Sequence, residues 1–502
     1  MRRFQWMASI CVLALIGTLS SISFAAYHHM GEGDSAKFLE VYPEREGSKL
    51  DSCALCHTGG KRMQGGKEVS LGSCQWCHYK YGYDATGNIE ETLNNYAKDF
   101  RNAGRDADAL RAIAKLDSDG DGYKNDAEIA ALRYPGDAAD TPERVAAPYR
   151  IFTRREFERL PAKYRHSQCL LMNTHKSGDF YAKYHGIVLG DLLEGLMLES
   201  ATGIQVIAAD GWSQYHPLFP DADPLLYHVF GDYPQAVYYY EEEADAAKNP
   251  GIGWCDYSAA CCAHLKPYRP IHNPRGLKLL LAFKRGGEYL NPGVLNEQNK
   301  LDGEGPFRVI PPQKNPGPPD QGSTSGYQNV IWPFDNDADH NAGFSSRTVT
   351  MIKVEPLPEG TTDIDTLEAG WEYVDANKVI VYGAIDPHGT LVEKADALLK
   401  DTTGLSTSDF RCSFLKHAFL AQLRLARFYI VHRRYAAALI YVEKRLMGET
   451  DGCIAGAQSD PREKDWITNC ETQKQIYWAL NEIKVLLNVG LKYGPFEVAE
   501  VK

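Results

Sequence analysis

Apolar and polar residues follow two different periodicities along the chain, one typical of strands and one typical of helices. Several short stretches in the middle are continuously apolar or alternate with polar positions, which predicts buried or half-buried strands. These stretches are 204–208, 277–283 and 348–354. Over 409–447 and 476–491, apolar residues recur every three or four positions, which predicts antiparallel amphipathic helices. The stretch 311–326 is rich in proline and glycine and predicts a loop.

The first 26 residues have the pattern of an export signal. Arg2 and Arg3 give a charged start, an apolar run follows over 10–19, and small residues predict cleavage near Ala25 or Ala26. An uncleaved membrane anchor is the alternative, but the apolar run is short for a membrane span. No later stretch is apolar for long enough to cross a membrane. We therefore expect a periplasmic or otherwise exported protein without a membrane span after signal removal.

Length and net charge limit the number of domains and the kinds of partner to expect. A chain of 502 residues exceeds what one hydrophobic core usually holds, which predicts about two to four domains. Signal removal takes away two arginines and no acids, so the formal net charge changes from −12 to −14. An acidic surface argues against nucleic-acid binding and is compatible with a cationic protein partner.

Two CxxCH motifs lie close together near the N-terminus, with 16 residues between them. Two thiols can form thioether bonds to the vinyl groups of a porphyrin, and the histidine that follows can bind the iron. We therefore expect two covalently attached c-type haems, with His57 and His78 as the proximal iron ligands. The alternative is a zinc knuckle that uses the same four cysteines. The expected attachment residues are Cys53 and Cys56 in the first motif, and Cys74 and Cys77 in the second.

The distal iron ligands are less tightly constrained by the sequence. His28 and His29 begin the mature chain about 25 residues before the first motif and could give bis-histidine iron. Met63, between the two motifs, is the other local candidate. Alternatively, the terminal histidines have no ligand role. Fallback ligands further along the chain are His166, His175 and His185.

An acidic loop follows the two motifs. Residues 117–128, DSDGDGYKNDAE, match the spacing of an EF-hand-type loop between expected helices over 108–116 and 127–132. Three alternating carboxylates repel one another unless a cation binds, so we expect one structural Ca2+ here. A solvated acidic turn is the alternative. The expected ligands are Asp117, Asp119, Asp121, the carbonyl of Tyr123, Asn125 and Glu128.

Seven cysteines remain once the signal and the two motifs are set aside. An oxidising compartment permits disulfides among them, and the odd number leaves at least one unpaired or otherwise used. Cys453 and Cys470 bracket the long loop between the C-terminal helices, so we expect them to be linked. Cys255, Cys261 and Cys262 are further disulfide candidates.

The middle region resembles sulfite-oxidase-type molybdopterin-binding domains in the order and spacing of its segments. That family shows a G-x-x-L-x-D-L-L helix, an A-D-G-Y strand end, an L-L-A-x-x-x-x-G-x-x-L segment and a G-P-x-R-L-V-x-P segment. The resemblance covers about 200 residues and implies a mixed α/β fold. The matching segments are HGIVLGDLL at 185–193, VIAADGWS at 206–213, LKLLLAFKRGGEYL at 277–290, GEGPFRVIPP at 303–312 and the strand at 348–354.

The cofactor of that family is a separate question. Its active members bind molybdenum through a cysteine in a C-x-G-N-R setting, and Cys169 lies at the corresponding place. Its context, QCLLMN, lacks the glycine and the arginine. The signature for export of a folded, cofactor-loaded protein is also missing around Arg2 and Arg3, whereas haem attachment normally follows unfolded export. Cys169 is thus the one candidate molybdenum ligand, but we expect no bound molybdopterin and a buried thiol or half of a disulfide instead.

The motif Gly303-Glu304-Gly305-Pro306 lies within this region. With the YHH start, the LDSCALCH and GSCQWCH segments and the DSDGDG loop, it is similar to a family of bacterial dihaem proteins named for the GEGP motif. This resemblance spans most of the chain and implies electron transfer without a settled substrate. The motif itself suits a tight turn, in which Glu304 caps neighbouring amides, and a catalytic Glu304 is the alternative.

These observations predict a multidomain α+β protein. We expect an N-terminal helical dihaem cytochrome c domain with an EF-hand-like loop, a central mixed α/β sulfite-oxidase-like domain and a C-terminal helical bundle. The expected boundaries are 1–26 for the signal, 27–147 for the dihaem domain, 148–360 for the central domain, 361–404 for a linker or strand extension, and 405–502 for the helices.

The function predicted from the sequence is periplasmic electron transfer. The expected partners are other periplasmic cytochromes or a terminal reductase, and an electron carrier is favoured over an enzyme. One alternative is a molybdopterin-dependent oxidoreductase that passes electrons to its own haems. A second is a redox sensor or ligand-binding protein. No catalytic residue can be assigned from the sequence.

Overall fold

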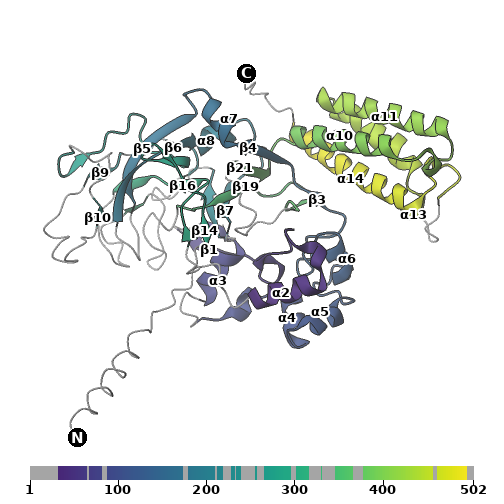
Figure 1. Ribbon diagram of the computed structural model, residues 1–502, viewed down its shortest axis with the longest axis horizontal. Helices are drawn as coiled ribbons and strands as arrows, with labels where there is room; N and C mark the ends of the chain where they lie inside the picture. The colour runs from purple at the N-terminus through teal and green to yellow at the C-terminus, as the bar shows by residue number, and fades with distance from the viewer. Residues whose placement is uncertain are drawn as a thin grey trace, which may run out of the picture.

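Figure 1 shows the chain as a computed structural model. The residues that the structure describes are 32–64, 67–81, 87–172, 179–209, 212–218, 228–231, 233, 235–238, 255–256, 265–295, 301–315, 329–330, 345–365, 377–455 and 461–494. The expected signal at 1–26 lies outside them, as do His28, His29, His175, Cys261 and Cys262. For Met63, His78 and Cys255 the backbone is described and the side chain is not.

The chain folds into helices and several sheets, so the coarse prediction of a multidomain α+β protein is confirmed. Figure 1 shows an N-terminal helical region in purple, central sheets in blue to green, and C-terminal helices in light green and yellow. None of the helices within the described ranges is long and apolar enough to cross a membrane.

Short helices make up most of the N-terminal region. Together with the turn at Leu50, their inward faces form one small core that includes Phe38, Leu50, Tyr96, Phe100 and Leu110. Polar side chains cap the helices, because the first amides of a helix have no partner within it. The elements are α2 (Glu32–Val41), η1 (Pro43–Arg45), η2 (Cys53–Leu55), β1 (Gly60–Gln64), β2 (Lys67–Leu71), α3 (Ser73–Tyr81), η3 (Ile89–Thr92), α4 (Asn95–Asn102), α5 (Ala107–Ile113) and α6 (Asn125–Ala130).

Two sheets form the central region. The five-stranded sheet has the order β4-β21-β19-β7-β8, and in it β19 is parallel to β21 and antiparallel to β7. Its strands are β4 (Tyr149–Thr153), β7 (Gly203–Ala208), β8 (Ser213–Pro217), β19 (Val349–Glu355) and β21 (Lys378–Gly383). The six-stranded sheet comprises β5 (Arg165–Met172), β6 (Asp179–Val188), β10 (Cys255–Asp256), β12 (Leu280–Arg285), β13 (Glu288–Tyr289) and β16 (Arg308–Ile310).

The main hydrophobic core lies between these two sheets. Ile204 and Ile352 enter it from the five-stranded sheet, and Leu281 and Phe283 from the six-stranded sheet. The other face of β12 is also covered, because Leu280 belongs to a second core. Such two-sided burial explains why the apolar run at 277–283 does not alternate.

Short elements complete the central region. Of the resembling segment 185–193, only α8 (Leu189–Leu193) is helical, because its first residues continue strand β6. Part of the expected loop at 311–326 is a strand, since β17 pairs with β18. The remaining elements are β3 (Val145–Ala146), α7 (Arg154–Arg159), β9 (Val237–Tyr238), β11 (Arg269–Pro270), β14 (Val294–Leu295), β15 (Leu301–Asp302), β17 (Gln313–Asn315), β18 (Asn329–Val330) and β20 (Thr361–Thr362).

The C-terminal region is a helical bundle that begins earlier than the sequence analysis placed it. Helix α10 contributes Leu391, Ala395 and Leu398 to the bundle core, and the range 361–404, expected as a linker or strand extension, also contains strands β20 and β21. Cys453 and Cys470 form the disulfide that the sequence predicts. The helices are α10 (His388–Gly404), η7 (Thr407–Asp409), α11 (Ser413–Val431), α12 (Tyr435–Ile440), the π-helical turn η8 (Tyr441–Leu446), η9 (Met447–Glu449), α13 (Gly452–Ala455) and α14 (Cys470–Tyr493).

Candidate functional site

The first CxxCH segment is a single helical turn. Within it, the amide of His57 donates to the carbonyl of Cys53 over 2.9 Å, and Leu55 is buried in the core of the N-terminal region. Cys53 is exposed and Cys56 is half-buried, and neither is in a disulfide. The core side chain therefore anchors the turn while both thiols remain available for covalent attachment.

Residues 92–94 also hold this turn in place, through hydrogen bonds. The amide of Thr58 donates to the carbonyl of Thr92 over 3.0 Å, and the amide of Asn94 donates to the carbonyl of Cys56 over 3.0 Å. The side chain of Asn94 donates to the carbonyl of Leu55 over 2.8 Å. The same side chain caps α4, because its oxygen accepts from the amide of Ala97 over 2.9 Å. We call Thr92, Leu93 and Asn94 the proximal clamp.

The proximal clamp also determines which nitrogen of His57 carries the hydrogen. Nδ1 of His57 lies 2.9 Å from the hydroxyl oxygen of Thr92, and that hydroxyl donates to the carbonyl of Ile89 over 2.7 Å. A hydroxyl has one hydrogen, so towards His57 it can only accept. Nδ1 therefore bears the hydrogen and Nε2 bears the lone pair. This is the tautomer in which a neutral imidazole binds a metal through Nε2.

The second CxxCH segment lies on a regular helix, α3, which carries Cys74 and Cys77 on successive turns. Both thiols are half-buried, and neither is in a disulfide. The helix lies against β8 of the five-stranded sheet, where Ser213 donates to the side-chain oxygen of Gln75 over 3.3 Å. The structure describes the backbone of His78 but not its side chain. The central region thus supports the second segment directly.

The two segments lie close to each other. Burial and then the neighbouring Cys53 raise the pKa of the Cys77 thiol, and burial, Asp34 and Cys53 raise the pKa of Cys56 to about 12. A zinc knuckle would bring the four sulfurs to one point. Among the described side chains, the cysteines form no group of three or more converging ligands.

The distal candidates are placed only in part. His28 and His29 lie outside the described residues, and Met63 is placed only by its backbone, in β1. Of the fallback ligands, Nε2 of His166 lies 3.0 Å from the carbonyl of Gly276, and Nδ1 of His185 lies 2.8 Å from the hydroxyl of Ser167. Both histidines are engaged within the six-stranded sheet, on β5 and β6.

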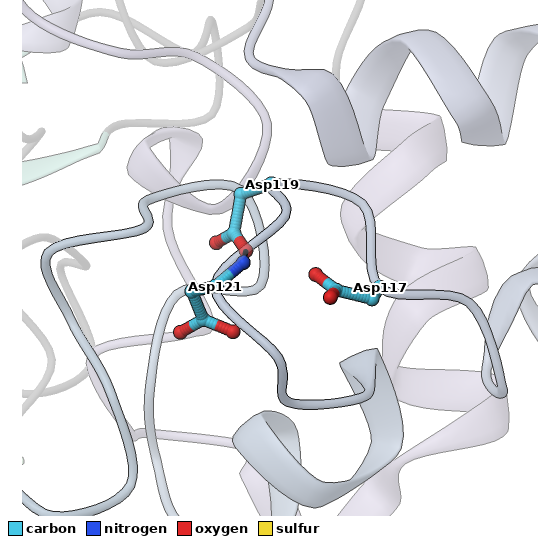
Figure 2. A group of neighbouring side chains, drawn as sticks. All are labelled: Asp117, Asp119 and Asp121. Atoms are coloured by element: carbon cyan, nitrogen blue, oxygen red, sulfur yellow. Dashed lines mark hydrogen bonds between the residues drawn. The ribbon is translucent and has the colours of Figure 1, made fainter.

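The acidic loop brings three carboxylates together. Oxygens of Asp117, Asp119 and Asp121 lie within 4.8 Å of one another, and Figure 2 shows Asp117 directed towards the other two. The loop is shaped by its own backbone: the two oxygens of Asp117 accept from the amides of Gly120 and Gly122, over 2.7 and 3.0 Å. Both glycines have positive φ, +83° and +100°, which suits a residue without a Cβ.

Glu128, at the twelfth position of the loop, has the most unusual environment among its acidic residues. Its side chain is fully buried, and neither carboxylate oxygen has a hydrogen-bond partner. Burial, then Asp119 and Asp121, raise the pKa of Glu128 to about 9. Burial and Asp121 also raise the pKa of Asp119 to about 6. Buried acids without partners are costly, and a hard divalent cation with oxygen ligands removes that cost. The donor set fits Ca2+.

The side chains of Asn125 and Tyr123, two further residues among the expected ligands, form hydrogen bonds within the protein. The side-chain oxygen of Asn125 accepts from the amide of Ser118 over 3.2 Å, and its nitrogen donates to the carbonyl of Ile113 over 2.9 Å. The Asn125 amide thus connects the loop to the end of α5. Tyr123, whose carbonyl is the expected ligand, donates through its hydroxyl to Glu143 over 2.8 Å.

A buried lysine connects the first segment to the central region. Lys49, four residues before Cys53, is fully buried, and its ammonium lies 2.9 Å from Asp140 and 2.9 Å from the hydroxyl of Thr362. It also lies 4.7 Å from the centre of the Tyr134 ring. A buried charge needs such partners, because desolvation otherwise costs several kcal/mol.

The structure does not support Cys169 as a molybdenum ligand. Cys169 is buried in β5 and is disulfide-bonded. Molybdenum would need its thiolate, whereas the Cys169 sulfur is already bonded, as expected for half of a disulfide. Of the other disulfide candidates in this region, only the backbone of Cys255 is described, in β10.

Glu304 of the GEGP motif is enclosed by polar partners. Tyr184 donates to it over 3.1 Å, Arg285 donates over 3.1 Å, and Arg308 forms a further ion pair. Burial alone would raise its pKa, yet Arg308 and Arg285 beside the carboxylate lower it. Gly303 has a φ of +89°, and a Cβ there would meet the carbonyl oxygen of Asn291 at 2.8 Å. The motif is therefore a packed turn around the carboxylate of Glu304, which is ionised and paired with two arginines.

Sequence reasoning missed the residues that support the first motif. Asn94 carries a readable signal, because asparagine before a helix is a common N-cap. Its second contact, to Leu55, joins residues 39 positions apart and has no local signature.

Comparison with models of known protein families, with curated proteins and with solved structures gave no match.

Proposed function

We propose that the chain is a c-type cytochrome with two covalently attached haems and that it carries electrons in the periplasm. The observation that carries this proposal is the pair of CxxCH segments. Four cysteines outside disulfides lie on one helical turn and on the neighbouring helix α3. The hydrogen-bonded tautomer of His57 suits an iron ligand. The resemblance to GEGP-motif dihaem proteins supports the same conclusion.

The residues would hold the haems as follows. Cys53 and Cys56 would attach the first porphyrin, and Cys74 and Cys77 the second, each thiol adding across one vinyl group. His57 would bind iron through Nε2, and His78 follows the second pair in the same order. A haem bound in this way supplies an iron that exchanges one electron between its ferrous and ferric states. The closeness of the two segments favours electron passage between the haems.

The rest of the chain supports this role without adding a redox centre. The acidic loop would hold one structural Ca2+, which neutralises Glu128 and the three aspartates. The central region would act as a scaffold, because the sulfur of Cys169 is already bonded. The partners would be other periplasmic cytochromes or a terminal reductase, for which an acidic surface offers complementarity to a cationic partner.

Paired cysteine variants test this proposal. The full chain would be produced in a host that attaches c-type haems, beside Cys53→Ala/Cys56→Ala and Cys74→Ala/Cys77→Ala. We expect two covalent haems per parent chain and one in each double variant, by mass spectrometry and haem absorbance. Elemental analysis should give two irons, with neither molybdenum nor zinc. A parent chain without covalent haem, or with stoichiometric zinc in place of iron, would contradict the proposal.

A further inference from the structure

We propose that Thr92 is the positioning residue for the proximal histidine of the first haem, so that its hydroxyl sets both the ring orientation of His57 and the electron density on that ring. This inference rests on the proposed function and goes beyond it, since the CxxCH motif does not specify what holds its histidine.

Three features fix the Thr92 hydroxyl in place. Its side chain is fully buried, so water does not compete for it. Threonine is β-branched, which restricts its first side-chain torsion. The hydroxyl hydrogen is already committed to the carbonyl of Ile89, at 2.7 Å, within the turn η3. The lone pairs of the oxygen therefore have one orientation, and Nδ1 of His57 lies 2.9 Å from it.

Backbone hydrogen bonds hold the hydroxyl of Thr92 beside the ring of His57. His57 and Leu93 face each other as an antiparallel bridge, and hydrogen bonds flank it on both sides, from Thr58 to Thr92 and from Asn94 to Cys56. The turn η3 is fixed at its start by Asn88, which accepts from the amide of Glu90 over 3.0 Å. Thr92 would therefore keep its position whether or not its side chain contacts His57.

This arrangement has a consequence for the iron. A partner that accepts from Nδ1–H raises the basicity of the opposite nitrogen, and so stabilises the more positive, ferric state. A neutral hydroxyl accepts less strongly than a carboxylate, so the effect is moderate and the ring stays a neutral imidazole. Loss of the hydroxyl should raise the midpoint potential of the first haem and leave the ring without its orienting partner.

The test uses Thr92→Val, which keeps the shape of the side chain and removes the hydroxyl. Thr92→Ser restores the hydroxyl, and Thr58→Val makes the same change at an exposed position beside His57. Each would be made in the full chain and in the Cys74→Ala/Cys77→Ala background, where only the first haem remains. Potentiometric titration measures the midpoint potential, and paramagnetic NMR detects the exchangeable Nδ1 hydrogen of the ligand histidine.

We expect Thr92→Val to raise the midpoint potential of the first haem and to speed solvent exchange of the Nδ1 hydrogen, with the second haem unchanged. Thr92→Ser and Thr58→Val should match the parent. If Thr92→Val does not fold, Thr92→Ala gives the same comparison without the added methyl group. Two attached haems with an unshifted potential and an unchanged Nδ1 hydrogen would overturn this inference alone. A parent without covalent haem would instead overturn the proposed function.

Discussion

The two CxxCH segments share one five-residue pattern and differ in almost everything that supports it. The first is a single turn held by the proximal clamp within the N-terminal region, and it follows the buried Lys49, whose partners are Asp140 and Thr362. The second is a regular helix laid against strand β8 of the central region. The motif specifies the attachment chemistry, whereas the surrounding fold specifies the environment. Each haem should therefore respond to its own set of perturbations.

The largest expected effect is on the first segment, from Lys49→Met. Removing the ammonium leaves Asp140 buried without its main partner, and breaking a buried ion pair in this way costs about 3–5 kcal/mol. Denaturation followed by haem absorbance should show this loss, and the first haem should change before the second. Lys37→Met is the control, because the partly exposed pair of Lys37 with Asp34 is worth about 1 kcal/mol or less. Equal losses in the two variants would refute the expectation.

Acidification should destabilise strand β8, against which the second CxxCH segment lies. Burial lowers the pKa of His216, on β8, from 6.5 to about 3. Below pH 6.5 the unfolded chain binds a proton there that the folded chain does not, so the free energy of unfolding falls as the pH decreases towards 3. At pH 4.5 the loss is roughly 3 kcal/mol. Denaturation curves from pH 7.5 to 4.5 measure it. His216→Gln should flatten this dependence, and an unaltered slope in that variant would exclude His216 as the cause.

Calcium removal should destabilise the first CxxCH segment before it affects the second. The hydroxyl of Ser118, in the acidic loop, donates to Asp99 of α4 over 2.8 Å, and α4 is capped by Asn94 of the proximal clamp. With Ca2+ at a hundred times its dissociation constant, chelation should lower the free energy of unfolding by about 3 kcal/mol. Glu128→Gln should abolish this calcium dependence, whereas the exposed Asp108→Asn should keep it. Thermal unfolding with and without chelator measures both. Identical curves for the parent would argue against a metal in the loop.

The smallest expected effect is on the second segment, from Gly72→Ala. The added methyl would lie 2.1 Å from the hydroxyl of Ser213, where α3 lies against β8, and such overpacking costs about 1–2 kcal/mol. Ser213→Ala removes the clashing oxygen, so the double variant should recover part of the loss. Denaturation followed by absorbance of the second haem measures the coupling. Strictly additive losses would show that the two residues do not meet.

Local patterns predicted much of the fold. Strands β7 and β19 follow their apolar runs, and α11 and α14 follow the helical spacing of their apolar residues. The disulfide between Cys453 and Cys470 follows from their position around one loop. Helix α10 also carries a readable signal, since Leu391, Ala395 and Leu398 recur at helical spacing, although we expected a linker or strand extension over 361–404.

The candidate site was predictable only where its residues are neighbours in sequence. Two CxxCH motifs and an alternating acidic loop are local patterns with a chemical reason for each position. The contacts of Thr92 with His57 and of Asn94 with Leu55 span 35 and 39 residues, and depend on how the chain returns to the first turn. No periodicity or composition encodes such a return. The attachment residues could thus be proposed from the sequence, and the contacts that position His57 could not.

The buried Lys49 has a consequence for the order of events when the protein is made. Its partner Thr362 lies 313 positions further along the chain. In the proposed periplasmic cytochrome, export would start from the N-terminus, so the first CxxCH turn would reach the periplasm long before this partner. Until then Lys49 lacks one of its partners, and the first turn lacks its link to the central region. Under the proposed function, that interval would give an attachment enzyme time to reach both thiols, and the later docking of the central region would then close the finished site.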